Sequence, residues 1–133
     1  MRRNAREAVY KLLFSNQFND KFDAEFKNFI YDEENLSDAD KEFADGLLSA
    51  YYAHESEVNN VISDLSRGYK PERLYSADKC ALQLAITEMT YTEGIPLIVT
   101  INEALDLVRK YSAEESPNFV NGVLAEYKKR LEA

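Results

Sequence analysis

Residues 77–96 read ADKCALQLAITEMTYTEGIP, and this stretch decides the fold class of the chain. Its apolar side chains recur at intervals of three and four residues, which is the spacing of one face of an α-helix. Gly94 and Pro96 then close the pattern, because both residue types terminate helices. The stretch therefore predicts a helix with one apolar face, made of Ala77, Ala81, Leu82, Ala85 and Met89.

The same helical periodicity continues in both directions. Ser37 is typical of a helix N-cap, and Ser116 followed by Pro117 predicts an N-cap with proline at the first helical position. Near His54 the pattern fits either one bent helix or two helices that meet. The remaining periodic segments cover about residues 4–18, 22–30, 38–53, 58–65, 101–111 and 117–131.

These segments predict an all-α fold of about six or seven helices. No run of four or more residues alternates between apolar and polar with turn signals on both sides, as a half-buried strand would. A chain of 133 residues with 45% hydrophobic residues is the right size for one compact domain. We expect two small helical bundles, about residues 1–67 and 68–133, packed as a single domain over residues 1–133.

Composition argues against a membrane protein and against an enzyme. No window approaches the roughly 20 uninterrupted apolar residues that span a bilayer, so we expect no membrane segment. The single cysteine, Cys80, excludes an internal disulfide and fits a cytoplasmic protein. Cys80 and the only histidine, His54, are the sole candidates for a nucleophile and an imidazole base, and Cys80 falls on an apolar helix face. We therefore expect no catalysis, no cofactor and no metal site.

Charge is distributed unevenly along the chain. The net charge is −8, which taken whole argues against nucleic acid, because neutralised phosphates supply most non-specific affinity. However, the first eleven residues include Arg2, Arg3, Arg6 and Lys11 against only Glu7, whereas residues 20–45 are rich in aspartate and glutamate. The charge distribution by itself fits two interpretations: both regions are solvated helix faces, or the basic N-terminal end binds the phosphate backbone of a nucleic acid.

Three segments of the chain, in this order and spacing, resemble the NusB family. They are RRNAREA at residues 2–8; YKPERL at 69–74 with DKCAL at 78–82 and EM at 88–89; and IP at 95–96 with TINEA at 100–104 and SPNFVNGVL at 116–124. Relatives often carry Leu-Arg where this chain has Leu82-Gln83, and tryptophan where it has Tyr69. Asn4 also interrupts the arginines of the basic arm.

The resemblance implies a cytoplasmic, all-helical factor that pairs with the ribosomal protein NusE. The pair would recognise the single-stranded boxA element of ribosomal RNA operon transcripts and help RNA polymerase to ignore terminators, with other Nus factors joining through the complex. The competing interpretation is a protein-binding helical adaptor without direct RNA contact. A homodimer is left open, because a basic arm and an acidic patch on one molecule could meet across two copies.

Within this resemblance, RNA contacts are expected at both ends of the sequence. Arg2, Arg3 and Arg6 lie at the start of the first helix, where guanidinium groups can reach phosphates or stack on unpaired bases. Phe119, with Asn118 beside it, could expose its ring for base stacking, although an apolar helix position is more often core.

Other positions are expected to face the protein partner or to serve packing. Glu72, Asp78 and Glu115 resemble family positions that face NusE, and a helix N-terminus would also favour such charges. Gly122 inside a helix predicts that a neighbouring helix, or else an RNA backbone, approaches closely. The remaining two positions, Asn102 and Asn121, are expected to be scaffold residues that hydrogen-bond if buried.

Overall fold

The computed structural model describes residues 1–17, 23–66 and 74–133, and its regular elements there are all helices. This confirms the all-α prediction. The helices are α1 (Arg2–Asn16), α2 (Ala24–Glu33), α3 (Asp38–Ala53), α4 (Glu55–Leu65), α5 (Ser76–Tyr91), α6 (Leu97–Tyr111) and α7 (Ser116–Glu132). The expected ends at Phe18 and Phe22 lie outside the described residues.

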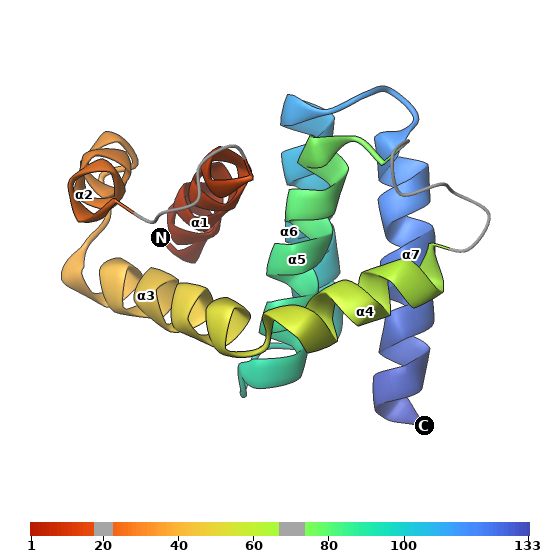
Figure 1. Cartoon of the computed structure of the whole chain (residues 1–133). Helices are drawn as coiled ribbons and strands as arrows, with labels where there is room; N and C mark the ends of the chain where they lie inside the picture. The colour runs from red at the N-terminus through yellow and green to blue at the C-terminus, as the bar shows by residue number, and fades with distance from the viewer. Residues whose placement is uncertain (18–22, 67–73) are drawn as a thin grey trace.

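Helix α5, the helix of the deciding stretch, is the centre of the molecule. It packs against α1 and α3 on one side and against α6 and α7 on the other, and α4 crosses it (Figure 1). Eleven of its 16 residues are buried, from Asp78 to Met89 with one exception. Small residues such as Ala81 and Ala85 suit this position, because several helices must approach α5 closely.

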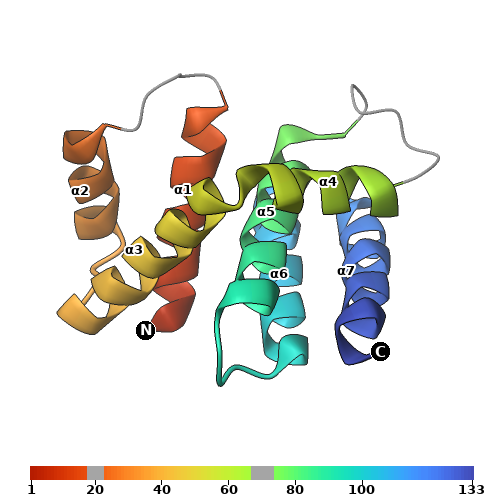
Figure 2. The same ribbon diagram turned by 60° about the horizontal axis from the view of Figure 1, so that its bottom comes forward.

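The helices form two groups joined through α5. Helices α1, α2 and α3 lie together at one side, and α5, α6 and α7 stand side by side at the other (Figure 2). Helix α4 crosses both α5 and α7, so it packs with the second group although the sequence places it in the first. One continuous apolar core, from Ala5 in α1 to Tyr127 in α7, joins both groups.

Local capping explains where several helices begin and end. Ser37 caps α3 as predicted, since its Oγ accepts a hydrogen bond from the Asp40 amide at 3.2 Å. At His54 the chain leaves helical geometry (φ −123°, ψ 27°), so α3 and α4 are two helices that meet there. The His54 ring stacks on Tyr91, with 4.0 Å between ring centroids, which fixes this junction against the end of α5.

Two details differ from the prediction. Ser116 is the first residue of α7 and Glu115 occupies the cap position without a side-chain cap, because the Ser116 hydroxyl donates to Asp78 instead. In α2 only the last part of the expected apolar face is covered. Ile30 is buried, whereas Phe29 is 56% exposed and stacks on Phe26.

Candidate nucleic-acid interface

The three arginines at the start of α1 occupy different environments, and Arg6 is buried. Its side chain is held by Glu88 of α5, with Nε 2.7 Å from Oε1 and Nη2 2.9 Å from Oε2. Thr100 of α6 also donates its hydroxyl to Glu88. Arg6 is only 5% exposed, so the expectation that it reaches out from the mobile end of the helix is corrected. The ion pair with Glu88 offsets the free-energy cost of burying the Arg6 charge.

Arg2 and Arg3 are exposed, as the sequence predicts. The Arg2 guanidinium lies 4.9 Å from the centre of the Phe43 ring, a cation–π contact with α3. Arg3 donates to Glu103 of α6, with Nε 3.2 Å from Oε2, and its Nη2 lies 3.7 Å from Asp106. Such exposed pairs are weak and are screened by salt, so a phosphate can compete for these guanidinium groups.

The surface between α1 and α6 continues toward the end of α6. The two helices run in the same direction, because Arg3 pairs with Glu103 while Glu7 accepts from Lys110 at 2.5 Å and from Tyr111. Burial raises the pKa of Glu7, but the hydrogen bonds from Lys110 and Tyr111 outweigh it and lower that pKa below its usual value. Lys110 is an exposed cation on the same surface as Arg3, and it is paired with Glu7 there.

The start of α7 presents polar groups and an open glycine. Asn118 is exposed, and Phe119 is partly buried and packs against the core. Gly122 is exposed too, and a Cβ there would meet nothing within 4 Å, so the close helix packing expected at Gly122 is not present. Asn102 and Asn121 are likewise exposed rather than buried scaffold residues. This face of α7 is accessible to another molecule.

Of the residues expected to face a protein partner, the structure describes Asp78 and Glu115, and their environments differ. Asp78 is 3% exposed and accepts from Ser112 at 2.6 Å and from Ser116 at 3.0 Å, so it ties the α6–α7 connection to α5 and is not free to meet a partner. Glu115 is exposed and accepts from the Tyr75 hydroxyl at 3.1 Å. Glu72 lies outside the described residues.

Sequence reasoning missed Lys110 and its neighbour Arg109. Both lie in the last turn of α6, where basic side chains also suit the helix dipole, so the sequence offers a local explanation for them. Only the pairing of α6 with α1 places Lys110 beside Glu7, about a hundred positions earlier in the chain. A search for basic residues at helix ends would have found the pair, but not its place beside the arginines.

The candidate nucleophile lies in the core. Cys80 is fully buried, as predicted for a core residue, and burial raises the pKa of its thiol to about 12. His54 is engaged with Tyr91 and faces Glu57 at 3.9 Å. Among residues 1–17, 23–66 and 74–133, no group of three His, Cys, Asp or Glu residues is placed to hold a metal ion. None of the helices described there is long and apolar enough to cross a membrane.

Comparison with known proteins identifies the family. A sequence model of the NusB family matches residues 3–129, which include Arg3 and Arg6 of α1 and the start of α7. The chain belongs to the NusB family. A protein of Agathobacter rectalis named transcription antitermination protein NusB is 39% identical over 128 residues, covering 95% of this chain and 98% of that protein. A NusB of Ruminiclostridium cellulolyticum is 34% identical over 128 residues, covering 96% and 88%.

Solved structures agree with the NusB assignment. The chain is similar to NusB of T. maritima, with a TM-score of 0.84 and 30% identity, over 100% of this chain and 98% of that one. It is also similar to a NusB chain in a crystal structure of antitermination factors NusB and NusE in complex with double-stranded RNA. There the TM-score is 0.85 at 25% identity, over 97% and 96% of the two chains. The described helices therefore have the NusB arrangement.

Proposed function

We propose that this NusB-family chain is an RNA-binding transcription antitermination factor that acts together with NusE. Its relatives are named as antitermination proteins, and a similar chain was solved with NusE and RNA. The observation that carries the proposal is the α1–α6 surface, where Arg2, Arg3 and Lys110 are exposed although the chain as a whole is acidic. Local positive charge is what a phosphate backbone requires.

The proposed RNA path leads from α1 to the start of α7. Arg2 and Arg3 contact phosphates at one end, and Lys110 and Arg109 continue the basic surface about 10 Å further along α6, given a rise of about 1.5 Å per residue. At the other end Asn118 offers hydrogen bonds, and the part of the Phe119 ring that the core leaves uncovered can stack on a base. Arg6 holds α1 against α5 and serves the path by positioning.

We assign boxA-like single-stranded RNA as the ligand and NusE as the helper that raises affinity and sequence preference. Single-stranded RNA displays its bases for stacking and hydrogen bonding, which the few contacts proposed here can read. Of the three carboxylates expected to face NusE, Glu115 is exposed beside Tyr75 and is available to a basic partner. An acidic surface speeds the encounter with such a partner more than it adds affinity.

Binding of fluorescent RNA tests the proposal. The full chain is titrated into boxA-like and scrambled single-stranded RNA, with and without NusE. We expect NusE to tighten binding and to increase the preference for the boxA-like strand. If NusE binds the chain but changes neither quantity, the adaptor interpretation without direct RNA contact replaces this one.

The salt dependence tests the arginines. Each phosphate contact with a single strand contributes about 0.7 to the slope of log affinity against log salt, so Arg2→Ala with Arg3→Ala should lower the slope by about 1.4. Lys128→Ala with Lys129→Ala, in the last turns of α7, removes the same charge away from the path. An equal loss of slope in both double variants would show that net charge, and not this surface, governs binding.

A further inference from the structure

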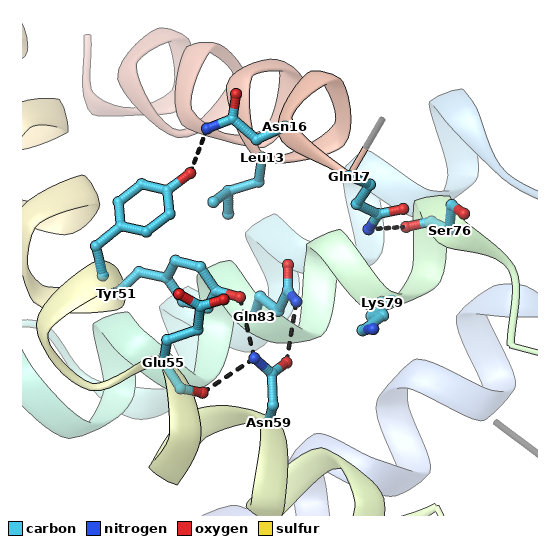
Figure 3. Close-up of a pocket in the computed structure, with 10 residues that line it drawn as sticks. Leu13, Asn16, Gln17, Tyr51, Glu55, Asn59, Ser76, Lys79 and Gln83 are labelled. Atoms are coloured by element: carbon cyan, nitrogen blue, oxygen red, sulfur yellow. Dashed lines mark hydrogen bonds between the residues drawn. The ribbon is translucent and has the colours of Figure 1, made fainter. Parts of the chain in front are cut away.

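A polar cavity of about 410 Å3 lies on another face, between the end of α1, the junction of α3 with α4, and the first turns of α5 (Figure 3). Leu13 of α1 and Gln17, the residue after α1, line one side, and Tyr51 of α3 with Glu55 and Asn59 of α4 line the other. The proposed RNA path does not use this cavity, and a volume of this size suits a side chain or a small ligand.

A chain of hydrogen bonds fixes the floor of the cavity. The amide nitrogen of Gln83 donates to Asn59 Oδ1 at 3.0 Å. The Asn59 amide nitrogen donates in turn to the Tyr51 hydroxyl at 3.1 Å and to the main-chain carbonyl of Glu55 at 2.9 Å (Figure 3). Three helices thus hold these groups in place before any ligand arrives, which lowers the entropy cost of binding.

One acceptor in this floor has no partner among the residues that the structure describes. Gln83 is only 5% exposed, and while its nitrogen is bonded to Asn59, its oxygen accepts no hydrogen bond from the residues that the structure describes. Figure 3 shows that oxygen turned away from Asn59. Among the described residues no fully buried side-chain oxygen or nitrogen lacks a hydrogen bond, so this oxygen is open to the cavity, where it can accept from a ligand that carries N–H groups.

Glu55 gives the cavity a carboxylate that can pair with a cation. The Glu55 carboxylate forms no ion pair within the described part of the chain, and it lies close enough to Tyr51 and Tyr52 to act on both hydroxyls. Burial first, and Glu55 in addition, raise the pKa of Tyr51 to about 12. A shallow trough shares Tyr52 and Glu55 with the cavity and adds Glu57. Lys79 lines the cavity as well, whereas Glu57 lies in the trough beside it.

These features point to a guanidinium group. It is flat, carries five N–H donors, pairs with carboxylates and stacks on aromatic rings. We infer that this cavity binds an arginine side chain of a protein partner, with Glu55 and the Gln83 oxygen as acceptors and the Tyr51 and Tyr52 rings beside it. Lys79 on the opposite wall then donates to a main-chain carbonyl next to that arginine.

Nuclear magnetic resonance with a short peptide tests the inference. Acetyl-Gly-Arg-Gly-amide is titrated into the 15N-labelled full chain, and the side-chain amide signals of Asn59 and Gln83 are followed. A single side chain is expected to bind with a dissociation constant of about 1–10 mM. The same peptide with citrulline, which has the shape of arginine without its charge, should bind at least threefold more weakly.

Two variants locate the site. Glu55→Gln should weaken peptide binding at least threefold, whereas Glu33→Gln, which removes an exposed carboxylate of α2 outside the cavity, should leave it unchanged. Gln83→Arg places a guanidinium of the chain itself in the cavity and should abolish binding. The inference is overturned if the arginine peptide leaves the Asn59 and Gln83 signals unmoved, if citrulline binds equally well, or if uridine monophosphate shifts these signals in its place.

Discussion

At the scale of single residues, the pair formed by Arg6 and Glu88 is the strongest constraint on α1. Both side chains are buried, and two hydrogen bonds join them. Removing one partner leaves an uncompensated buried charge, which costs about 3–5 kcal/mol. We expect Arg6→Leu and Glu88→Leu each to lower the free energy of unfolding by this amount, measured by urea denaturation at neutral pH.

The double variant separates the pair from its packing. When both charges are replaced by leucine, no isolated charge remains, so Arg6→Leu with Glu88→Leu should cost far less than the sum of the single changes. A small residual loss is expected, because the Thr100 hydroxyl loses its acceptor. Additive single and double losses would show that the two side chains do not act as a pair.

The same residues show what sequence patterns could not predict. Arg6 and Asp78 were expected at the surface because charged side chains usually lie there, and both are buried. Their partners, Glu88 and Ser116, lie 82 and 38 positions away along the chain. Periodicity reports on neighbours within one helix, so it carries no information on such distant pairs. Cys80 was predicted correctly because its helix face decides its burial.

At the scale of elements, periodicity predicted the helices well but not what covers them. The break at His54 and the cap at Ser37 follow from local chemistry and are present in the structure. The start of α7 was displaced by one residue because Asp78, from another helix, takes the Ser116 hydroxyl. The cavity at Gln83 could not be predicted either, because α1, α4 and α5 each supply part of its wall.

Helix α7 offers a prediction that separates stability from binding. Gly122 lies inside an exposed helical turn with open space around it, so Gly122→Ala should stabilise the chain by about 0.5–1 kcal/mol. If an RNA backbone approaches this turn, the same methyl group should weaken RNA binding. Thermal unfolding and RNA titration of the one variant measure both effects. Unchanged RNA affinity in a stabilised variant would remove Gly122 from the proposed RNA path.

At the scale of the whole molecule, the balance of charges and buried hydroxyls sets the response to pH. Tyr10 of α1, Tyr31 of α2 and Tyr51 of α3 are all buried, and burial is the main reason that the pKa of each is raised. They lie in the three helices of the first group, and Tyr10 also donates to the Ala77 carbonyl at 2.9 Å. The attachment of this group to α5 therefore depends on protonated phenols.

Alkaline conditions should consequently weaken the fold. The unfolded chain releases tyrosine protons near pH 10, whereas folded Tyr51 keeps its proton until a pKa of about 12. Between these values the unfolded state binds fewer protons, so the free energy of unfolding falls as pH rises. Urea denaturation at several pH values above neutrality measures this slope. Tyr51→Phe removes one such group, so the free energy of unfolding should fall less steeply between about pH 10 and 12 in this variant. An equally steep fall would show that Tyr51 does not contribute to alkaline unfolding.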